Sequence, residues 1–263
     1  DFLLGVRFVD GQGRIVKNGG RVMKNVTGYD LVKLMAGSYG TLGVLTEVAL
    51  KVLPRPRSTG VMRVEGLSDA QAITALSRAL GSPYEVTGAA HLQRGVDGAP
   101  VTMIRLEGFE NSVAYRAAEL QSLLAEFGSF TLETDPEKTE ADWHYVRDVA
   151  PFHGRDGDVW RISVKPTDAA EIVADLAGAE ALYDWGGGLI WLLAPEGSGV
   201  NAAKLRAAVA ARGGHAMLIR GDRSRATFPP LPAPVAALQE GLRQKFDPRQ
   251  ILNPGLMAQG ETA

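Results

Sequence analysis

The chain has 263 residues, of which 45% are hydrophobic and 22% charged, and its formal net charge is −2. These values are ordinary for a globular protein, and a balance so close to neutral gives no reason to expect nucleic-acid binding. No stretch approaches the roughly 18 consecutive apolar residues that a membrane span requires. Cysteine is absent, which excludes disulfides, thiolate metal sites and iron–sulfur ligation by this chain.

The chain opens with a predicted β-hairpin. Residues 3–9 alternate in polarity and can pair with residues 14–17 across Asp10-Gly11-Gln12-Gly13, a run of turn-forming residues. The sequence enters this strand directly, with neither Met nor a basic leader before it. We therefore expect an N-terminally truncated fragment of a longer protein.

A helix, a glycine-spaced loop and a strand follow. The helix is expected over 30–36, and the loop carries glycine at 37, 40 and 43. Apolar residues at every second position predict a strand over 44–53, which prolines then close.

The glycine spacing has two interpretations. It does not fit the dinucleotide fingerprint, which has a different spacing and lies where a strand ends and a helix begins. One interpretation is a side-chain-free backbone against which a flat ligand can lie. The other is a helix C-cap at Gly37 followed by a tight turn.

The middle of the chain contains two blocks with the same order of elements. In the first block Ser68 caps a helix and Gln71 completes a capping box. Its strands are expected over 61–64, 85–92, 101–107 and 130–133, and its helices over 68–80 and 111–127.

The second block is expected to begin with alternating Trp160, Ile162 and Val164, and Thr167 is expected to cap a helix to about residue 177. Further strands are expected over 182–185, 189–193 and 217–219, with a helix around Leu205 that ends at Gly213. Each block is then βαββαβ, an arrangement that lays helices on one face of an antiparallel sheet. The fold class is α+β, with a single broad sheet built from both blocks.

A helix over 136–149 is expected to link the blocks. His144 and Asp148 are four residues apart and share a helix face, which is half of a metal site or an ordinary solvated helix end. No second ligand pair has metal spacing, so we expect no metal.

The tail carries a last helix that Pro232 or Pro234 opens. Val235, Leu238 and Leu242 are expected to form its buried stripe. Asn253-Pro254-Gly255, taken alone, predicts a turn.

Three segments together resemble a known family. They are Lys-Asn-Val-Thr-Gly-Tyr-Asp-Leu at 24–31, Gly-Ser-Tyr-Gly-Thr-Leu-Gly-Val-Leu-Thr-Glu at 37–47 and Phe-Asp-Pro-Arg-Gln-Ile-Leu-Asn-Pro-Gly at 246–255. They are similar to the FAD-linked oxidases, whose FAD-binding domain is of the PCMH type (vanillyl-alcohol-oxidase-like). Within that family the first segment looks most like the FAD-binding subunit of bacterial glycolate oxidases.

The resemblance implies a division into three parts. Residues 1–57 would be the C-terminal part of the FAD-binding domain, residues 58–223 an α+β cap (substrate) domain, and residues 224–263 a segment that returns to the FAD domain.

The resemblance also implies site residues. Residues 39–45 would wrap the adenosine and pyrophosphate of FAD, Gly40 and Gly43 would allow close approach, and Thr41 would supply a hydroxyl. Asn253 would lie near the flavin ring. The complete set of implied cofactor-binding residues is Lys24, Gly28, Tyr39, Gly40, Thr41, Leu42, Gly43, Val44, Leu45 and Asn253.

The implied activity is that of an FAD-dependent oxidoreductase that acts on CH–OH groups. The chain would be a subunit of a 2-hydroxy-acid (glycolate) oxidase or dehydrogenase, which forms glyoxylate or relays electrons, and the fragment alone would be inactive. Its partners would be a sister FAD-linked catalytic subunit and an iron–sulfur subunit, in the cytoplasm or at the inner membrane through those partners.

A carboxylate substrate favours an arginine, and Arg161 and Arg147 are the candidates, with a plain surface or sheet-face role as the alternative for each. The alternative function is a non-catalytic structural subunit that does not retain flavin.

Overall fold

The computed structural model describes residues 2–22, 28–222 and 225–257, and the chain divides into two units. Unit 1 comprises Asp1–Pro54 and Ala226–Ala263, and unit 2 comprises Arg55–Arg225. Unit 2 begins in the Pro54-Arg55-Pro56 run, where proline removes backbone donors and interrupts regular structure.

Unit 1 is built on a three-stranded antiparallel sheet in the order β2-β1-β3. Strand β1 (Leu3–Val9) pairs with β2 (Ile15–Gly19) so that Val9 faces Ile15, and with β3 (Val44–Leu50) on its other edge. The hairpin between β1 and β2 is closed by Asp10, whose buried carboxylate accepts the N–H groups of Gln12 and Arg14, each at 2.9 Å.

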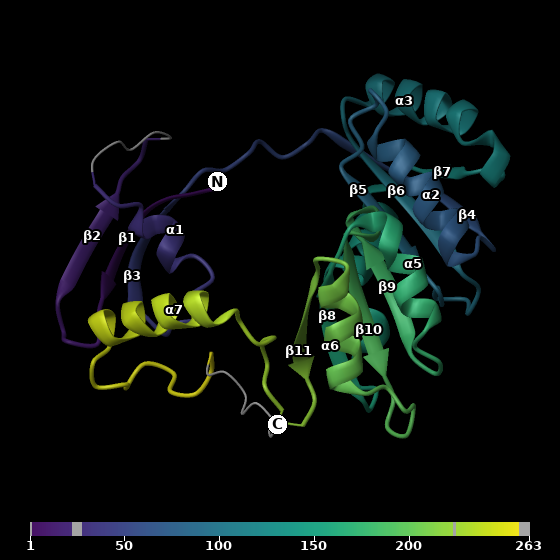
Figure 1. The fold of residues 1–263 in the computed structure, drawn as a ribbon. Coiled ribbons are helices and arrows are strands. Elements are labelled where there is room, and N and C mark those ends of the chain that lie inside the picture. The colour runs from purple at the N-terminus through teal and green to yellow at the C-terminus, as the bar shows by residue number, and fades with distance from the viewer. Residues whose placement is uncertain (1, 23–27, 223–224, 258–263) are drawn as a thin grey trace. The chain divides into compact units, whose positions relative to one another are not determined.

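Two helices pack on this sheet (Figure 1). They are α1 (Leu31–Met35) and α7 (Ala233–Phe246), which lies more than 180 residues further along the chain than β3. The core of unit 1 is small: Phe8 and Val6 of β1 lie against α1 and against Phe246, the last residue of α7. The C-terminal segment of the chain is thereby fixed to the N-terminal hairpin.

Unit 2 contains the two predicted blocks. The first consists of β4 (Ser58–Glu65), α2 (Asp69–Leu80), β5 (Gly88–Leu92), β6 (Val101–Gly108), α3 (Glu110–Leu123) with η1 (Ala125–Phe127), and β7 (Thr131–Glu133). The second consists of β8 (Asp158–Ser163), α5 (Pro166–Ala174), β9 (Glu180–Asp184) with η3 (Trp185–Gly187), β10 (Leu189–Ala194), α6 (Ala202–Ala211) and β11 (His215–Arg220). Helix α4 (Pro136–Arg147) and η2 (Ala150–Phe152) join them.

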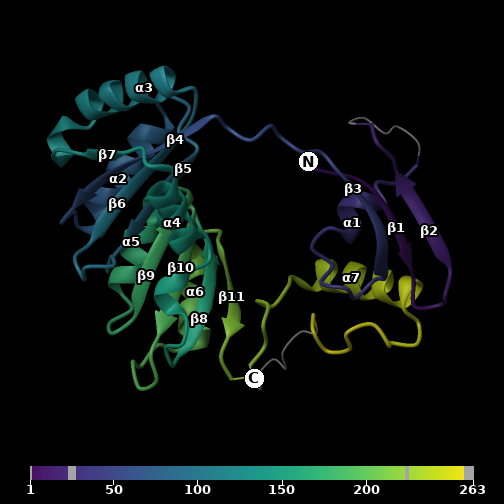
Figure 2. The same cartoon turned by 180° about the vertical axis from the view of Figure 1, so that it is seen from behind.

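The strands of both blocks form one antiparallel sheet of eight, in the order β11-β8-β10-β9-β5-β6-β4-β7. Helices α2, α3, α5 and α6 cover one face, where the two largest apolar clusters lie. Seen from behind, α4 crosses the other face (Figure 2), packing Val146 against strand residues such as Leu182 and Met103. The α+β prediction and the single sheet are confirmed.

A polar cluster ties the two blocks together where β5 meets β9. His91 on β5 and Tyr183 on β9 are fully buried, and both reach the carboxylate of Asp69, the first residue of α2. The Tyr183 hydroxyl and Gln93 Nε2 donate to Asp69 Oδ2, both at 2.6 Å, and His91 Nε2 lies 3.3 Å from Oδ1. Burial raises the pKa of Asp69, but the hydrogen bonds from His91, Tyr183 and Gln93 outweigh it and hold this pKa below its usual value.

Of the two predicted helix N-caps in unit 2, one is confirmed and one is wrong. The capping box of α2 is present, with Ser68 and Gln71 each hydrogen-bonded to the other's backbone. The prediction that Thr167 caps α5 is wrong: Lys165 is the N-cap and Pro166 occupies the first turn. Proline is favoured there because its missing N–H is one that the helix leaves unpaired in any case.

Two further expectations, for the start of β5 and for the buried face of α7, differ from the structure. Strand β5 begins at Gly88 rather than at residue 85, because Glu85 has a φ of 46° that no strand can contain. The predicted buried stripe of α7 is wrong: Val235, Leu238 and Leu242 are 47%, 71% and 37% exposed. These three side chains instead line a pocket beside α7.

Candidate cofactor site

The glycine loop, residues 37–43, follows α1 and has an unusual backbone conformation. Asp30 caps the helix by accepting the N–H of Lys33 at 3.1 Å, and the helix ends two residues before the loop. Gly37, Tyr39 and Gly40 then have φ values of 82°, 53° and 69°. These are left-handed values that glycine adopts without strain and tyrosine rarely adopts. Tyr39 is held there, with its ring edge-on to Phe228 at 5.0 Å between ring centroids.

The C-terminal segment turns sharply after α7. Asp247 is completely buried, and its carboxylate accepts the N–H groups of Ile251 at 3.1 Å and Leu252 at 2.8 Å. Arg243 of α7 donates to the Leu252 carbonyl oxygen at 3.0 Å. The turn brings Asn253 out with a φ of 44°, a conformation that asparagine tolerates better than most residues.

The two segments meet in one hydrogen bond. Asn253 Nδ2 donates to the carbonyl oxygen of Tyr39 at 2.9 Å, across 214 positions of sequence. A Cβ added to Gly40 would lie 2.8 Å from the same nitrogen, so with a side chain at residue 40 the Asn253 amide would have to shift. Glycine loop and Asn-Pro-Gly turn therefore form a single structural feature.

A pocket of about 450 Å³ opens beside this contact. Its apolar lining is partly solvent-exposed: Tyr39, Val44 and Leu45 expose 49%, 57% and 46% of their surface. A volume of this size lies within the roughly 300–1,000 Å³ of typical small-molecule sites. The lining residues are Met35, Ser38, Tyr39, Gly40, Gly43, Val44, Leu45, Ile251, Leu252 and Asn253.

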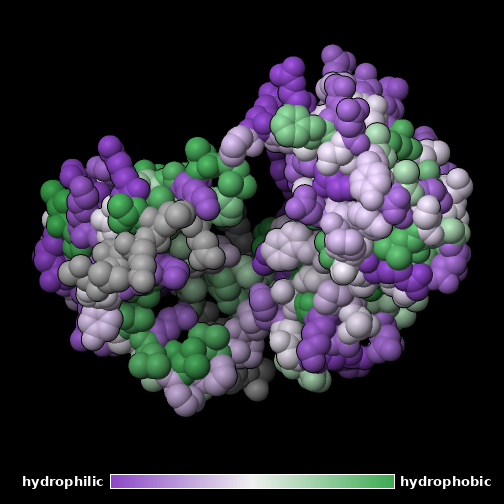
Figure 3. Space-filling model, turned by 90° about the horizontal axis from the view of Figure 1, so that it is seen from above, coloured by the Kyte–Doolittle hydropathy of each residue, from purple (hydrophilic) through white to green (hydrophobic). Residues whose placement is uncertain are grey.

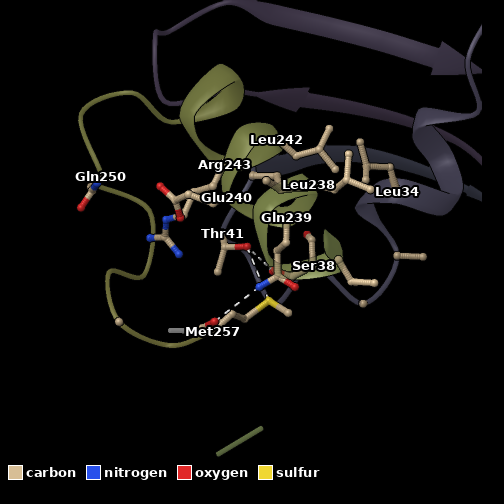
Figure 4. A pocket seen from close by; sticks show the side chains of 15 residues that line it. Leu34, Ser38, Thr41, Leu238, Gln239, Glu240, Leu242, Arg243, Gln250 and Met257 are labelled. Carbon is tan, nitrogen blue, oxygen red and sulfur yellow. Dashed lines mark hydrogen bonds between the residues drawn. The ribbon is translucent and has the colours of Figure 1, made fainter. Parts of the chain in front are cut away.

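A second pocket, of about 420 Å³, is lined by residues of the glycine loop and of α7 (Figure 4). Thr41 and Leu42 line it, and the hydroxyl of Thr41 donates to the Ser38 carbonyl oxygen at 2.7 Å. The apolar stripe of α7, with Leu238 and Leu242, faces the same pocket. In the space-filling view of Figure 3, several patches of hydrophobic residues reach the surface of unit 1.

The structure thus gathers six of the implied cofactor residues around the first pocket: Tyr39, Gly40, Gly43, Val44, Leu45 and Asn253. Thr41 and Leu42 line the second pocket instead. Gly28 lines neither of these two pockets, and Lys24 lies outside the described residues.

Gly43 lines the pocket and also packs against strand β1. Its φ is not in the left-handed region, and a Cβ there would lie 2.7 Å from Phe8 Cδ2 and 3.0 Å from the Val9 carbonyl oxygen. The position therefore needs glycine because strand β1 packs against it. Gly40, by contrast, needs glycine for its φ and for the amide of Asn253.

The residues singled out in unit 2 lie on the α4 side of its sheet or on α4 itself. Arg147 forms a paired contact with its neighbour Asp148, at 2.7 and 2.8 Å, and this arginine holds the pKa of that carboxyl below its usual value. Arg161 lies over the ring of Trp185, 5.7 Å from its centroid. His144 Nε2 is 3.7 Å from Glu140 rather than paired with Asp148. Within residues 2–22, 28–222 and 225–257, no three His, Asp or Glu side chains group as a metal site.

Sequence reasoning missed the buried support of the pocket. From the sequence, Asp247 is assigned no role beyond the 246–255 motif, and Gly11 is assigned only to a turn. Aspartate followed by proline does favour a turn in which the carboxylate binds backbone N–H groups further on, so a signal existed. Nothing local indicated that Gly11 would pack against that carboxylate.

Comparison with known proteins identifies the class. No family profile matches the chain. Among solved structures, 4-ethylphenol oxidase from Gulosibacter chungangensis is similar with a TM-score of 0.69 at 14% identity, covering 98% of this chain and 66% of its own. p-Cresol methylhydroxylase is similar with a TM-score of 0.64 at 12% identity, covering 97% and 65%. These two likenesses show the fold. With the sequence likeness reported next, they show that the chain resembles the FAD-linked oxidases, whose FAD-binding domain is of the PCMH type.

Within that family, the chain is similar to glycolate oxidase subunit GlcE of Escherichia coli (strain K12), with 38% identity over 258 residues. The match covers 98% of this chain and 65% of GlcE, so the chain spans about two thirds of that relative's length. The chain is also similar to glycolate oxidase subunit GlcD of Bacillus subtilis (strain 168), with 43% identity over 58 residues. This shorter match covers 22% of this chain and 12% of GlcD.

Proposed function

We propose that this chain binds FAD through unit 1 and works as an FAD-dependent oxidoreductase subunit acting on a small 2-hydroxy acid, with glycolate as the first candidate. The observation that carries the proposal is the contact between the glycine loop and Asn253 beside an open apolar pocket. The 38% identity to GlcE supports glycolate in particular.

The residues around the pocket suit a flat, polar-edged cofactor. Val44, Leu45 and Tyr39 offer exposed apolar surface, against which a planar ring system can lie. The N–H groups of Tyr39 and Gly40 donate to no described residue, so they are available to phosphate or carbonyl oxygens. When bound, FAD would supply the hydride chemistry, while the protein would supply position and electrostatics.

The hydrogen bond between Asn253 and Tyr39 refines the expected placement. The resemblance assigned the glycine loop to the adenosine and pyrophosphate and Asn253 to the flavin ring. Since the two residues touch, we propose that both motifs face the same portion of FAD. The apolar wall of Val44 and Leu45 would pack on one face of that portion, and the Asn253 amide would lie at its edge.

The substrate's carboxylate would be bound by unit 2, with Arg161 and Arg147 as the candidates. Arg147 is already paired with Asp148, so a substrate would have to compete with that carboxyl. Among the described residues Arg161 has an aromatic neighbour rather than a carboxylate, which leaves its hydrogen-bond donors to a ligand. On this ground we favour Arg161.

The partners we propose are a sister FAD-linked catalytic subunit and an iron–sulfur subunit, because this chain has no cysteine with which to hold a cluster. Among the described residues, no helix is long and apolar enough to cross a bilayer. We place the assembly in the cytoplasm or at the inner membrane through its partners.

The test is an anaerobic addition of glycolate to the purified full-length protein, first alone and then with its partner subunits. Bleaching of flavin absorption in the isolated protein supports a catalytic subunit, and bleaching only in the assembly supports an electron relay. A protein that carries no flavin in either preparation would instead be a structural subunit.

A further inference from the structure

Asn253 depends on a support that lies outside the pocket. The segment 251–253 contains no helix or strand, yet it must present one amide to the Tyr39 carbonyl oxygen. A loop of this kind has a defined geometry only if its backbone groups are bound. The N–H groups of Ile251 and Leu252 both donate to Asp247, which is completely buried.

Asp247 is in turn positioned by the hairpin between β1 and β2. The Gly11 N–H donates to the Phe246 carbonyl oxygen at 2.8 Å, and Gln12 Nε2 donates to the Lys245 carbonyl oxygen at 3.0 Å. These carbonyls lie at the end of α7, where a helix has no internal donors left to satisfy them. The hairpin therefore caps α7 immediately before Asp247.

The fit between the hairpin and Asp247 leaves no room for a side chain. A Cβ added to Gly11 would lie 2.8 Å from Asp247 Cα and 2.9 Å from its Cβ, and closer still to Oδ1. Asp10 fixes the turn that carries Gly11: its carboxylate binds the Gln12 and Arg14 N–H groups and also Nε of Arg14 at 2.8 Å. Asp10, which is also buried, therefore fixes the part of the hairpin that packs against Asp247.

We propose that Asp247, seated against Gly11, is the positioning residue for Asn253 and so for the wall of the cofactor pocket. This inference rests on the proposed FAD site and assigns it a support in the N-terminal hairpin. Asp247 acts through Asn253 and does not touch the ligand itself.

The test is a double-mutant cycle on FAD affinity in the full-length protein. Asn253→Ala and Asp247→Asn should each weaken FAD binding by about tenfold, the loss expected when one well-placed polar contact disappears. The amide of the Asp247→Asn variant directs N–H toward a backbone donor, so at least one of the two turn hydrogen bonds is lost. The double variant should bind FAD no more weakly than Asn253→Ala alone, because coupled residues are not additive.

Gly11→Ala should reproduce the loss of affinity. Gly20→Ala is its matched control, since a Cβ there meets no atom within 4 Å and its φ is ordinary. The proposal would be overturned if the losses of FAD affinity from Asn253→Ala and Asp247→Asn were additive in the double variant while circular dichroism showed both single variants to be folded. Asp247 would then only stabilise unit 1.

A flavin-independent measurement separates this inference from the proposed function. Asp247→Asn should speed amide hydrogen exchange at Leu252 while leaving exchange in β1 unchanged. If the wild-type protein binds no FAD, the proposed function fails, and the exchange data still decide whether Asp247 orders the turn. Unchanged exchange at Leu252 would contradict that role whatever the flavin result.

Discussion

Replacing Gly40 by alanine perturbs the candidate site at its most constrained position. Gly40 has a φ of 69°, and a Cβ there would lie 2.8 Å from Asn253 Nδ2. The left-handed backbone costs an L-residue roughly 1–2 kcal/mol. Displacing Asn253 would also remove its hydrogen bond to Tyr39, which contributes about 0.5–1.5 kcal/mol.

Gly37→Ala is a matched control because it bears only the first of these costs. Gly37 has a φ of 82°, but a Cβ there meets nothing within 4 Å. The difference between the two variants therefore isolates the Asn253 contact. At about 1 kcal/mol it corresponds to a roughly fivefold greater loss of FAD affinity for Gly40→Ala.

The assay is titration of the full-length apoprotein with FAD, followed by flavin fluorescence, with thermal unfolding by circular dichroism as the folding control. Equal losses of affinity for Gly37→Ala and Gly40→Ala would refute the argument that the Asn253 contact shapes the site. A third variant, Gly43→Val, should act through the core near Phe8. Overpacking of about 1–3 kcal/mol should lower its melting temperature along with its flavin content.

Three further predictions concern unit 2. Ser68→Ala removes the capping box of α2 and should lower the free energy of unfolding by about 1 kcal/mol, measured by urea denaturation, whereas an unchanged midpoint would contradict the cap's contribution. Because the folded-state pKa of Asp69 lies below its usual value, its stabilisation is present above that usual value and is lost as the pH falls through the folded pKa. Unfolding free energy should therefore decline below about pH 4, less steeply in Asp69→Asn, and parallel pH profiles would argue against this. His144→Ala should leave the flavin-to-protein ratio after gel filtration unchanged, since the His144 side chain forms a surface pair with Glu140; lost flavin would move the site toward α4.

The architecture of unit 2 could be predicted because its signals are local and repeated. Strand alternation, helical spacing and the Ser68–Gln71 capping box each act within a few residues. Most apolar residues on the helix-covered face also pack within their own block. The failure at Thr167 has a local cause as well, since Pro166 competes for the helix start. The His91–Asp69–Tyr183 cluster was not predicted, because it joins strands from different blocks.

Unit 1 was harder because its geometry depends on distant contacts. Burial of the α7 stripe was inferred from spacing alone, which indicates that Leu238 and Leu242 share a face but not what covers it. The need for glycine at 40 and 43 could be predicted from the resemblance, whereas its physical reason could not. Gly40 faces Asn253 and Gly43 faces Phe8. This difference can be recognised only in the folded structure.

The most direct test of the central claim is photoaffinity labelling of the full-length protein with an azido analogue of FAD, followed by mapping of the labelled peptides. Because Asn253 donates to the Tyr39 carbonyl oxygen, we predict that a single analogue labels both the peptide containing residues 39–45 and the peptide containing residues 251–253. Excess FAD should suppress both adducts. Labelling confined to unit 2, or to one of the two motifs with every analogue tried, would contradict a shared FAD site.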